Sequence, residues 1–356
     1  MPASGSLLRA PSPRILVVRL GAMGDILHTL PAAASLKHSF PASHLTWLVE
    51  PQWTALLEGN PFVDGVVLLR RQSLAGLFES WRTLRSGGYD FAVDFQGLFK
   101  SALAAASARP ERIFGFHQSQ LREPGAALFY SNKILSRATH VVEKNLDLAA
   151  GAGASGLLHT FPLPPGRPEG DLPNGDFVLA SPLAGWRSKQ WPIEHYQALA
   201  ARLLRELGVP LVLNLPPQAL PTQALPTQAL PPQALPTQAV LAGADAGNAA
   251  WPHTSGLPGL IYATRRAAAI VGVDSGPLHL AAAIGKPGVA IYGPTDPARN
   301  GPYGGSMKVL RLADAATTYK RGEEVADSMR RVSPDEVFAA LKALLAGRRH
   351  GVGSPA

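Results

Sequence analysis

Residues 269–296 read AIVGVDSGPLHLAAAIGKPGVAIYGPTD, and this stretch decides the fold class. The short apolar run 269–273 is rich in β-branched residues and predicts a buried parallel strand that ends at Asp274. Ser275 then suits a helix N-cap, and a second apolar run over 289–292 predicts the next strand. The first turn of this strand–helix–strand unit presents backbone N–H groups that suit a phosphate. An ordinary, well-capped turn fits the same pattern, so the turn alone does not establish a function.

A similar turn opens the chain. Residues 14–20 (RILVVRL) predict a buried strand, and residues 21–25 (GAMGD) lead into a helical pattern. The two glycines of this turn allow the backbone to approach a ligand closely. Asp25 falls at the start of the helix, where a carboxylate is first of all a cap. The spacing is not the G-x-G-x-x-G fingerprint, so the turn gives no support to a nicotinamide cofactor.

Strands and helices alternate through both halves of the chain, which predicts two open parallel sheets with ligands beyond the carboxyl ends of their strands. The predicted strands are 14–20, 44–50, 65–70, 89–95 and 111–115, and then 176–181, 210–215, 269–273 and 288–292.

Residues 215–239 are five tandem copies of Leu-Pro-(Pro/Thr)-Gln-Ala. Proline at every fifth residue forbids a continuous helix or a central strand, so an extended or disordered excursion is expected. Two origins stay open. We favour the expansion of a short repeat inside a tolerated surface loop, and the alternative is a partner-binding arm.

The composition restricts the class of protein. A chain of 356 residues, 46% of them hydrophobic, suggests about two domains. It contains no cysteine, so a disulfide framework and a cysteine–zinc site are excluded. No apolar stretch reaches the roughly 18 residues of a membrane span, and we expect a soluble or peripheral protein. The net charge of +8 suits an acidic substrate or an anionic membrane face, and equally suits scattered surface charge.

Seven motifs in order resemble those of glycosyltransferase family 9, most closely its type I lipopolysaccharide heptosyltransferases. They are residues 21–31 (GAMGDILHTLP), 94–101 (DFQGLFKS), 122–130 (REPGAALFY), 140–145 (HVVEKN), 189–192 (KQWP), 273–280 (VDSGPLHL) and 292–297 (YGPTDP). Any one motif is weak evidence, but seven in order are hard to obtain by chance.

The resemblance covers most of residues 14–346 and implies the GT-B fold: α/β, with two facing Rossmann-like parallel-sheet domains and a cleft between them. In relatives with this fold a final helix packs back on the N-terminal domain, and the same packing is open here. The expected parts are a flexible N-terminus (1–13), an N-terminal acceptor domain (14–160), a Pro- and Gly-rich linker (161–175), a C-terminal nucleotide-sugar domain (176–333), a C-terminal helix (334–346) and a flexible tail (347–356).

The resemblance also implies an inverting, metal-independent transfer of heptose from ADP-heptose to the Kdo of the lipopolysaccharide inner core. Asp25 is the implied general base, although a helix N-terminus stabilises its carboxylate and so weakens it as a base. Lys189 is the candidate clamp of the departing diphosphate, where negative charge grows, and its alternative is a solvated loop lysine. The other candidate donor-binding residues are Gly24, Asp274, Ser275, Gly276 and His279.

The acceptor of the family is an anionic, Kdo-bearing lipid A, and arginine suits it because the guanidinium fork binds carboxylates bidentately. The candidate acceptor-binding residues are Arg70, Arg71 and Arg122, with Lys100 and His140 as further options; one of the first pair can equally be solvated loop charge. The sequence has no Asp-x-Asp motif, and its His and Asp residues are not spaced as a ligand set. We therefore expect neither a metal nor any cofactor besides the nucleotide-sugar substrate.

The implied partners are a nucleotide sugar, an anionic glycolipid acceptor and the anionic inner-membrane surface, with no nucleic acid. The implied location is cytoplasmic, peripheral on the inner face of the cytoplasmic membrane. Two other interpretations stay open: another family 9 transferase, acting with a second heptose or another sugar, and a catalytically silent sugar-nucleotide-binding protein of the same fold. The joint presence of Asp25, Lys189 and Asp274 argues against the silent protein, and the segments 122–124 and 140–145 favour the type I group.

Overall fold

The computed structural model describes residues 12–215 and 250–351. Of the repeat over 215–239, only Leu215 falls within these ranges, and there it ends a strand. The rest of the repeat lies outside the described residues, as does most of the two chain ends predicted to be flexible. In the described part of the chain, no helix combines the length and the apolarity that crossing a membrane requires.

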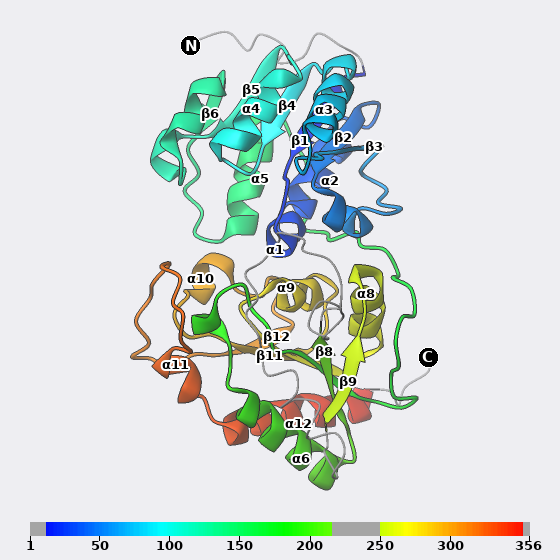
Figure 1. Ribbon diagram of the computed structural model, residues 1–356, viewed down its shortest axis with the longest axis vertical. Coiled ribbons are helices and arrows are strands. Elements are labelled where there is room, and N and C mark those ends of the chain that lie inside the picture. Colours follow the sequence, from blue (N-terminus) through cyan, green and yellow to red (C-terminus); the bar gives the residue numbers. More distant parts are fainter. Residues whose placement is uncertain (1–11, 216–249, 352–356) are drawn as a thin grey trace. The chain divides into compact units, whose positions relative to one another are not determined.

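The chain divides into two compact units. One comprises Met1–Pro164 with Ala298–Asn300, and the other Pro165–Pro297 with Gly301–Ala356. Each unit contains one six-stranded sheet whose strands are all parallel, with helices packed on it (Figure 1). The predicted fold class, α/β with two Rossmann-like parallel-sheet domains, is confirmed.

The sheet of the first unit has the strand order β3-β2-β1-β4-β5-β6. The order reverses at β1, so the carboxyl ends of β1 and β4 adjoin at the switch point where such sheets bind ligands. The strands are β1 (Arg14–Val18), β2 (His44–Val49), β3 (Gly65–Leu68), β4 (Phe91–Asp94), β5 (Arg112–Phe116) and β6 (Asn132–Ile134). The helices are α1 (Met23–Leu27), α2 (Leu30–Ser39), α3 (Leu74–Ser86), α4 (Phe99–Ser107) and α5 (Val141–Gly151), with 3₁₀ turns η1 (Pro51–Leu56), η2 (Gln118–Gln120) and η3 (Pro124–Phe129).

The sheet of the second unit has the order β12-β11-β10-β7-β8-β9, and its switch point lies between β10 and β7. Its strands are β7 (Val178–Ser181), β8 (Leu211–Leu215), β9 (Ala250–Thr254), β10 (Ala269–Val273), β11 (Gly288–Ile291) and β12 (Met307–Leu310). The other elements are η4 (Arg187–Lys189), α6 (Ile193–Leu207), α8 (Leu257–Arg266), α9 (Gly276–Ala283), α10 (Pro297–Asn300), α11 (Asp327–Arg330) and α12 (Pro334–Gly351).

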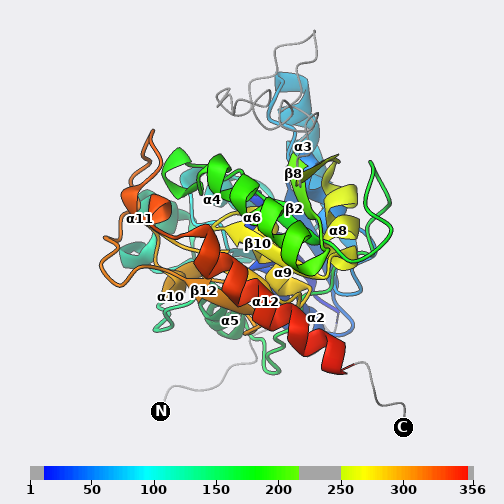
Figure 2. The same ribbon diagram turned by 90° about the horizontal axis from the view of Figure 1, so that it is seen from below.

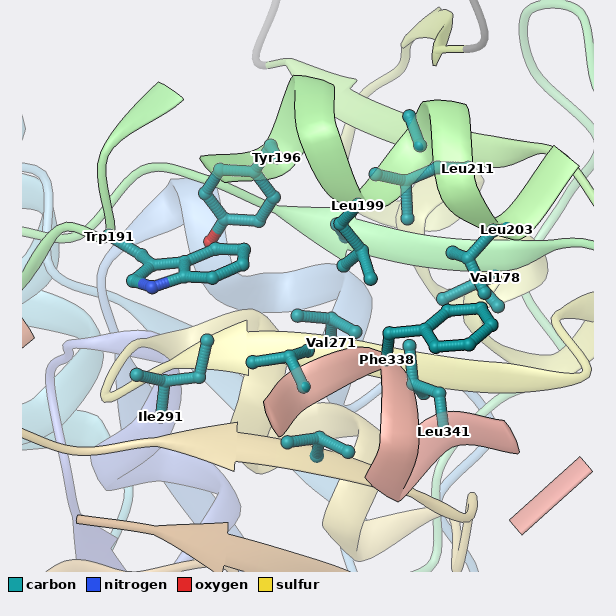
Figure 3. Packing of buried hydrophobic residues seen from close by; sticks show 14 of the residues in the cluster. Val178, Trp191, Tyr196, Leu199, Leu203, Leu211, Val271, Ile291, Phe338 and Leu341 are labelled. Carbon is teal, nitrogen blue, oxygen red and sulfur yellow. The ribbon is translucent and has the colours of Figure 1, made fainter. Parts of the chain in front are cut away.

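The last helix, α12, packs in the second unit. It lies beside α6 (Figure 2), and both helices contact the second sheet. Phe338 and Leu341 are buried there with Leu203 and Val271 (Figure 3). The suggestion that this helix packs on the N-terminal domain is therefore wrong, because its apolar residues fill the core of the C-terminal one.

The start of α12 follows the sequence prediction. The Ser333 hydroxyl accepts a hydrogen bond from the backbone N–H of Glu336 at 3.2 Å, and the Glu336 carboxylate accepts the N–H of Ser333 at 2.9 Å. This reciprocal pair is a capping box, and the helix that it caps begins at Pro334, the predicted first residue. The helix runs further than predicted, to Gly351.

Candidate functional site

Asp25 lies in α1, just beyond the carboxyl end of β1, and its side chain is 45% exposed. Arg19 Nη2 lies 2.8 Å from Asp25 Oδ1, and Arg19 Nη1 donates a hydrogen bond to the Phe95 carbonyl. Arg19 is buried, and its contacts with Asp25 and with the Phe95 carbonyl fix the position of its guanidinium. The guanidinium in turn fixes the orientation of the Asp25 carboxylate. Asp25 thus combines a fixed orientation with access to solvent, which a base that receives a proton from a bound ligand requires.

Residues 94–101 hold the turn that follows β1 in place. Asp94 is completely buried, and the Gln96 side chain, two residues on, accepts the Leu20 N–H at 3.1 Å. The turn after β4 is thereby tied to the turn after β1. Burial raises the pKa of Asp94, while its hydrogen bonds act in the opposite direction. The Asp94 carboxylate accepts from Gln96 N (2.9 Å), Gly97 N (3.2 Å), Ser101 Oγ (2.8 Å) and the Tyr130 hydroxyl (2.7 Å).

The end of β2 brings a second charged pair to the same edge of the sheet. Arg71 Nε donates to Glu50 Oε1 at 2.7 Å, and the Glu50 side chain is only 10% exposed. A Cβ at Gly21 would lie 2.7 Å from Trp53 Nε1 and 3.7 Å from Glu50 Oε2. The glycine is therefore required for the close approach of the β1 turn to Trp53, and Arg71 is joined through Glu50 to the neighbourhood of residues 21–25.

The other two predicted acceptor-binding arginines are placed differently. Arg70 is half exposed, lies 3.5 Å from Glu79 and lines a pocket of about 490 Å³ beside α3. Arg122 is exposed between η2 and η3, and within residues 12–215 and 250–351 its side chain makes no hydrogen bond or ion pair. Glu123, the next residue, accepts the Phe99 N–H at 2.8 Å and so places Arg122 near the start of α4. In the part of the chain that the structure describes, no hydrogen bond or ion pair joins the three arginines.

His140, the further acceptor option, has the contacts of a helix cap. Its Nδ1 accepts the Val142 N–H at 3.2 Å, and its ring meets that of His28 edge to face, with 5.9 Å between the centroids. Asn145, on the same helix, donates to the His28 carbonyl at 2.9 Å. The motif over 140–145 therefore fastens α5 to the segment that follows α1. Lys100 is exposed at the start of α4.

In the second unit, Asp274 is the centre of a buried polar cluster at the carboxyl end of β10. Its Oδ2 accepts from Lys189 Nζ at 2.6 Å and from Thr295 Oγ1 at 2.8 Å, while Oδ1 lies 3.3 Å from Nε2 of His279. Burial acts to raise the pKa of Asp274, but His279 and Lys189 together hold it well below its ordinary value. Asp274 is thus an ionised anchor that orients three other side chains.

Lys189 is the last residue of the 3₁₀ turn η4, and its side chain is 15% exposed. Its ammonium is 4.4 Å from the centroid of the Trp186 ring and 2.6 Å from Asp274 Oδ2. An ammonium group carries three donors, and Asp274 takes one of them. The lysine is therefore a held positive charge and not a solvated loop residue.

Ser275 occupies the N-cap position of α9, as predicted, with an extended backbone (φ −153°, ψ 165°). Its hydroxyl makes no capping bond: it is buried and lacks a hydrogen-bond partner among the described residues. The N–H groups of Ser275 and Gly276 likewise have no backbone acceptor there. Together they are unused donors at a helix N-terminus, directly after the carboxylate that holds Lys189.

The structure brings the donor-side residues of the second unit together, namely Lys189, Asp274, Ser275, Gly276 and His279. Asp25 and Gly24 lie in α1 of the first unit. Two residues were missed. Arg19 is a charge at the end of an otherwise apolar buried strand, and Thr295 lies inside the motif over 292–297; both signals are present in the sequence. Within the described part of the chain, no cluster of three His, Cys, Asp or Glu side chains is arranged to hold a metal ion.

Comparison with known proteins gives consistent matches over most of the chain. The model of "Glycosyltransferase family 9 (heptosyltransferase)" matches residues 77–328. Lipopolysaccharide heptosyltransferase 1 of Escherichia coli (strain K12) is 29% identical over 321 residues, which is 84% of this chain and 93% of that protein. Lipopolysaccharide heptosyltransferase 2 of Salmonella typhimurium (strain LT2) is 26% identical over 362 residues, 93% and 98% of the two chains. The structure of E. coli heptosyltransferase WaaC with ADP-2-deoxy-2-fluoro heptose superposes with a TM-score of 0.68 at 26% identity, covering 93% of this chain and 99% of that one.

Proposed function

The chain belongs to glycosyltransferase family 9 (heptosyltransferase), and from this premise we propose that it transfers heptose from ADP-heptose to the Kdo of the lipopolysaccharide inner core, with inversion at the anomeric carbon. The observation that carries the proposal is the cluster around Asp274. It fixes the Lys189 ammonium on the carboxylate of Asp274, the residue that directly precedes the unused donors at the start of α9. A fixed cation beside a helix N-terminus is a site for a diphosphate.

The proposed donor site stabilises the leaving group. As the bond between the anomeric carbon and the diphosphate oxygen breaks, negative charge grows on the diphosphate. Lys189 and the N–H groups of Ser275 and Gly276 meet that charge, and because Asp274 and its partners hold the lysine in advance, little reorganisation is needed. In this proposal the lysine and the helix N-terminus take the place of a metal ion.

The proposed base is Asp25. The acceptor hydroxyl attacks the anomeric carbon from the face opposite the diphosphate, and its proton passes to the carboxylate as the new bond forms. Arg19 engages Oδ1, which leaves Oδ2 as the proton acceptor. Proton transfer is expected late, when the attacking oxygen is already acidic.

The proposed acceptor is an anionic glycolipid, with Arg70, Arg71 and Arg122 as its binding residues and the cytoplasmic face of the inner membrane as its location. The E. coli and S. typhimurium relatives carry both names, heptosyltransferase 1 and 2, at similar identity. A second-heptose transferase is therefore the alternative. Incubation of the protein with ADP-heptose and either Kdo-lipid A or its monoheptosylated form, followed by mass spectrometry, distinguishes the two. Transfer to the first acceptor supports the proposal, and transfer to the second alone contradicts it.

Arg19 is expected to act as a positioning residue for Asp25. Arg19→Gln removes the contact that fixes the carboxylate, and a misplaced catalytic group costs on the order of 10²-fold in kcat. Arg19→Lys restores the charge but not the fork that reaches both Asp25 and Phe95, so partial rescue is expected. The measurement is kcat and the acceptor KM, with the pH dependence of kcat. Equal kcat in the Lys and Gln variants would contradict the assignment.

Arg122→Ala is expected to raise the acceptor KM at least tenfold, since a hydrogen bond to a charged group contributes about 1.5–3 kcal/mol. Donor affinity is expected to stay unchanged. Steady-state kinetics against each substrate provide the check, with Lys133→Ala on the exposed edge strand β6 as the control. An equal loss toward both substrates would show that Arg122 does not bind the acceptor.

A further inference from the structure

Helix α3 turns its large apolar side chains toward solvent. Leu74, Leu77, Phe78 and Trp81 are 86%, 40%, 60% and 44% exposed. Residues separated by three, four and seven positions lie on one side of a helix, so the four form a continuous stripe. We call this stripe the α3 face.

The opposite side of α3 packs on the first sheet through mostly small residues. Ser80 Oγ donates to the Leu68 carbonyl at 2.8 Å, which joins the helix to β3. A Cβ at Gly76 would lie 2.6 Å from the Arg70 carbonyl, so the glycine allows the helix to approach the chain closely. The buried residues of α3 are Gly76, Ser80 and Leu84. Packing in the first unit therefore does not account for the apolar residues of the α3 face.

Positive charge accompanies the α3 face. Arg85 stands over the Trp81 ring, with its guanidinium carbon 5.5 Å from the centroid. Arg82 is exposed, and within the described residues no carboxylate forms an ion pair with either arginine. The acidic residue of the helix, Glu79, lies 3.5 Å from Arg70. The surface thus joins aromatic and aliphatic side chains to unneutralised arginines.

The neighbouring helix extends the apolar surface. α4 packs beside α3 on the same sheet (Figure 1). It exposes Phe99 and Leu103 by 50% each, and Leu128 of η3, which packs on α4, is 84% exposed. The outer sides of two neighbouring helices thus form one apolar surface, of a kind that can lie on the interfacial region of a lipid bilayer.

We propose that the α3 face docks the protein on an anionic lipid bilayer. Aromatic and leucine side chains enter the boundary between headgroups and acyl chains, and the arginines bind anionic headgroups. The inference rests on the proposed function, in which the acceptor is a membrane lipid. Arg70 and Arg71 precede α3 by a few residues, so docking through α3 brings these proposed acceptor-binding residues to the level of the headgroups.

A fluorescence experiment tests the location of the contact. The chain has no cysteine, so Leu77→Cys offers a single site for an environment-sensitive dye. Leu204→Cys on α6, at a leucine of similar exposure (45% against 40%), is the matched control. Vesicles of phosphatidylglycerol and phosphatidylcholine are expected to shift the dye emission to the blue at Leu77→Cys and not at Leu204→Cys. No shift at either site, or equal shifts at both, would overturn the proposal.

Binding measurements separate the two contributions. Phe78→Ser with Trp81→Ser is expected to weaken vesicle binding at least tenfold, and Leu204→Ser with Trp251→Ser, at similarly exposed sites of the second unit, to leave it unchanged. Arg82→Gln with Arg85→Gln is expected to weaken it about tenfold or more at low salt and to have little effect at high salt or on pure phosphatidylcholine. Arg321→Gln with Arg330→Gln, at two exposed arginines of the second unit, is the matched charge control. Equal binding by the α3 variants and their controls would refute the assignment.

Two further measurements keep the outcomes distinct. Transfer to a short-chain, water-soluble acceptor is expected to be unchanged in the α3 variants. Vesicle binding without any transfer by the parent protein would leave docking intact and contradict the proposed function instead. A concentration-dependent dimer that the α3 variants abolish, without vesicle binding by the parent, would show that the face joins two copies of the chain and would overturn the proposal.

Discussion

Asp25→Asn is expected to lower kcat by about 10²–10⁴-fold, the usual contribution of a general base, while the affinity for the donor nucleotide stays nearly unchanged. The amide keeps the shape of the side chain, and its oxygen can still accept from Arg19. It cannot receive the proton of the attacking hydroxyl, so the loss is expected in the chemical step alone.

The alternative for Asp25 is a purely structural role at the start of α1. Among the described residues its side chain makes no capping hydrogen bond, and it is 45% exposed, so the melting temperature of Asp25→Asn is expected to differ little from that of the parent. Single-turnover rates and donor titrations decide the question. Glu194→Gln, an exposed first-turn carboxylate of α6, is the matched control. Parent-like turnover by Asp25→Asn would remove Asp25 from the mechanism.

Lys189→Ala is expected to weaken donor binding and to lower kcat as well, because the charge on the diphosphate grows toward the transition state. Removing one stabilising donor of this kind costs about 10²–10³-fold in kcat. The variant also removes the ammonium that neutralises the buried Asp274, while the contacts with His279 and Thr295 remain. Removing one member of a buried ion pair destabilises a protein by as much as about 3–5 kcal/mol, and the two remaining partners are expected to reduce that cost.

A second variant separates stability from function. Lys189→Ala combined with Asp274→Asn removes the unpaired charge and is expected to recover part of the melting temperature, but not donor binding. The pH dependence provides a further check. Because the folded-state pKa of Asp274 is depressed, its contribution to stability is present above the ordinary aspartate pKa and is lost as the pH falls below it. Without Lys189 this contribution is smaller, so the difference in melting temperature between Lys189→Ala and the parent is expected to shrink as the pH falls below the ordinary aspartate pKa. Parent-like donor affinity in Lys189→Ala would contradict the diphosphate role.

The sequence by itself determined the interior of each sheet and the identity of the site motifs. The interior strands β1, β2, β4, β5, β7, β8, β10 and β11 were all predicted, because strands buried on both faces read as apolar runs. The turns after 14–20 and 269–273 were located for the same reason, since each follows such a run. The start of the C-terminal helix at residue 334 was also predicted, and the capping box found there is a local pattern of four residues.

The strands that the sequence did not reveal, β6, β9 and β12, all lie at sheet edges. They are short and partly exposed, and β9 contains Pro252, a residue that an edge strand tolerates because its outer side needs no hydrogen bond. Their identity as strands depends on the neighbour that pairs with them, and this is not visible in their own pattern.

Only the tertiary structure decided which polar residues act together. Lys189 reaches Asp274 across 85 positions of sequence, and Thr295 reaches the same carboxylate across 21. The link from Arg19 to the Phe95 carbonyl, which helps to hold Asp25, spans 76. The tertiary structure also decided that α12 packs on the second sheet. Local propensity and spacing specify elements and turns, whereas such contacts arise where the carboxyl ends of adjacent parallel strands meet, and that meeting is fixed by strand order and core packing.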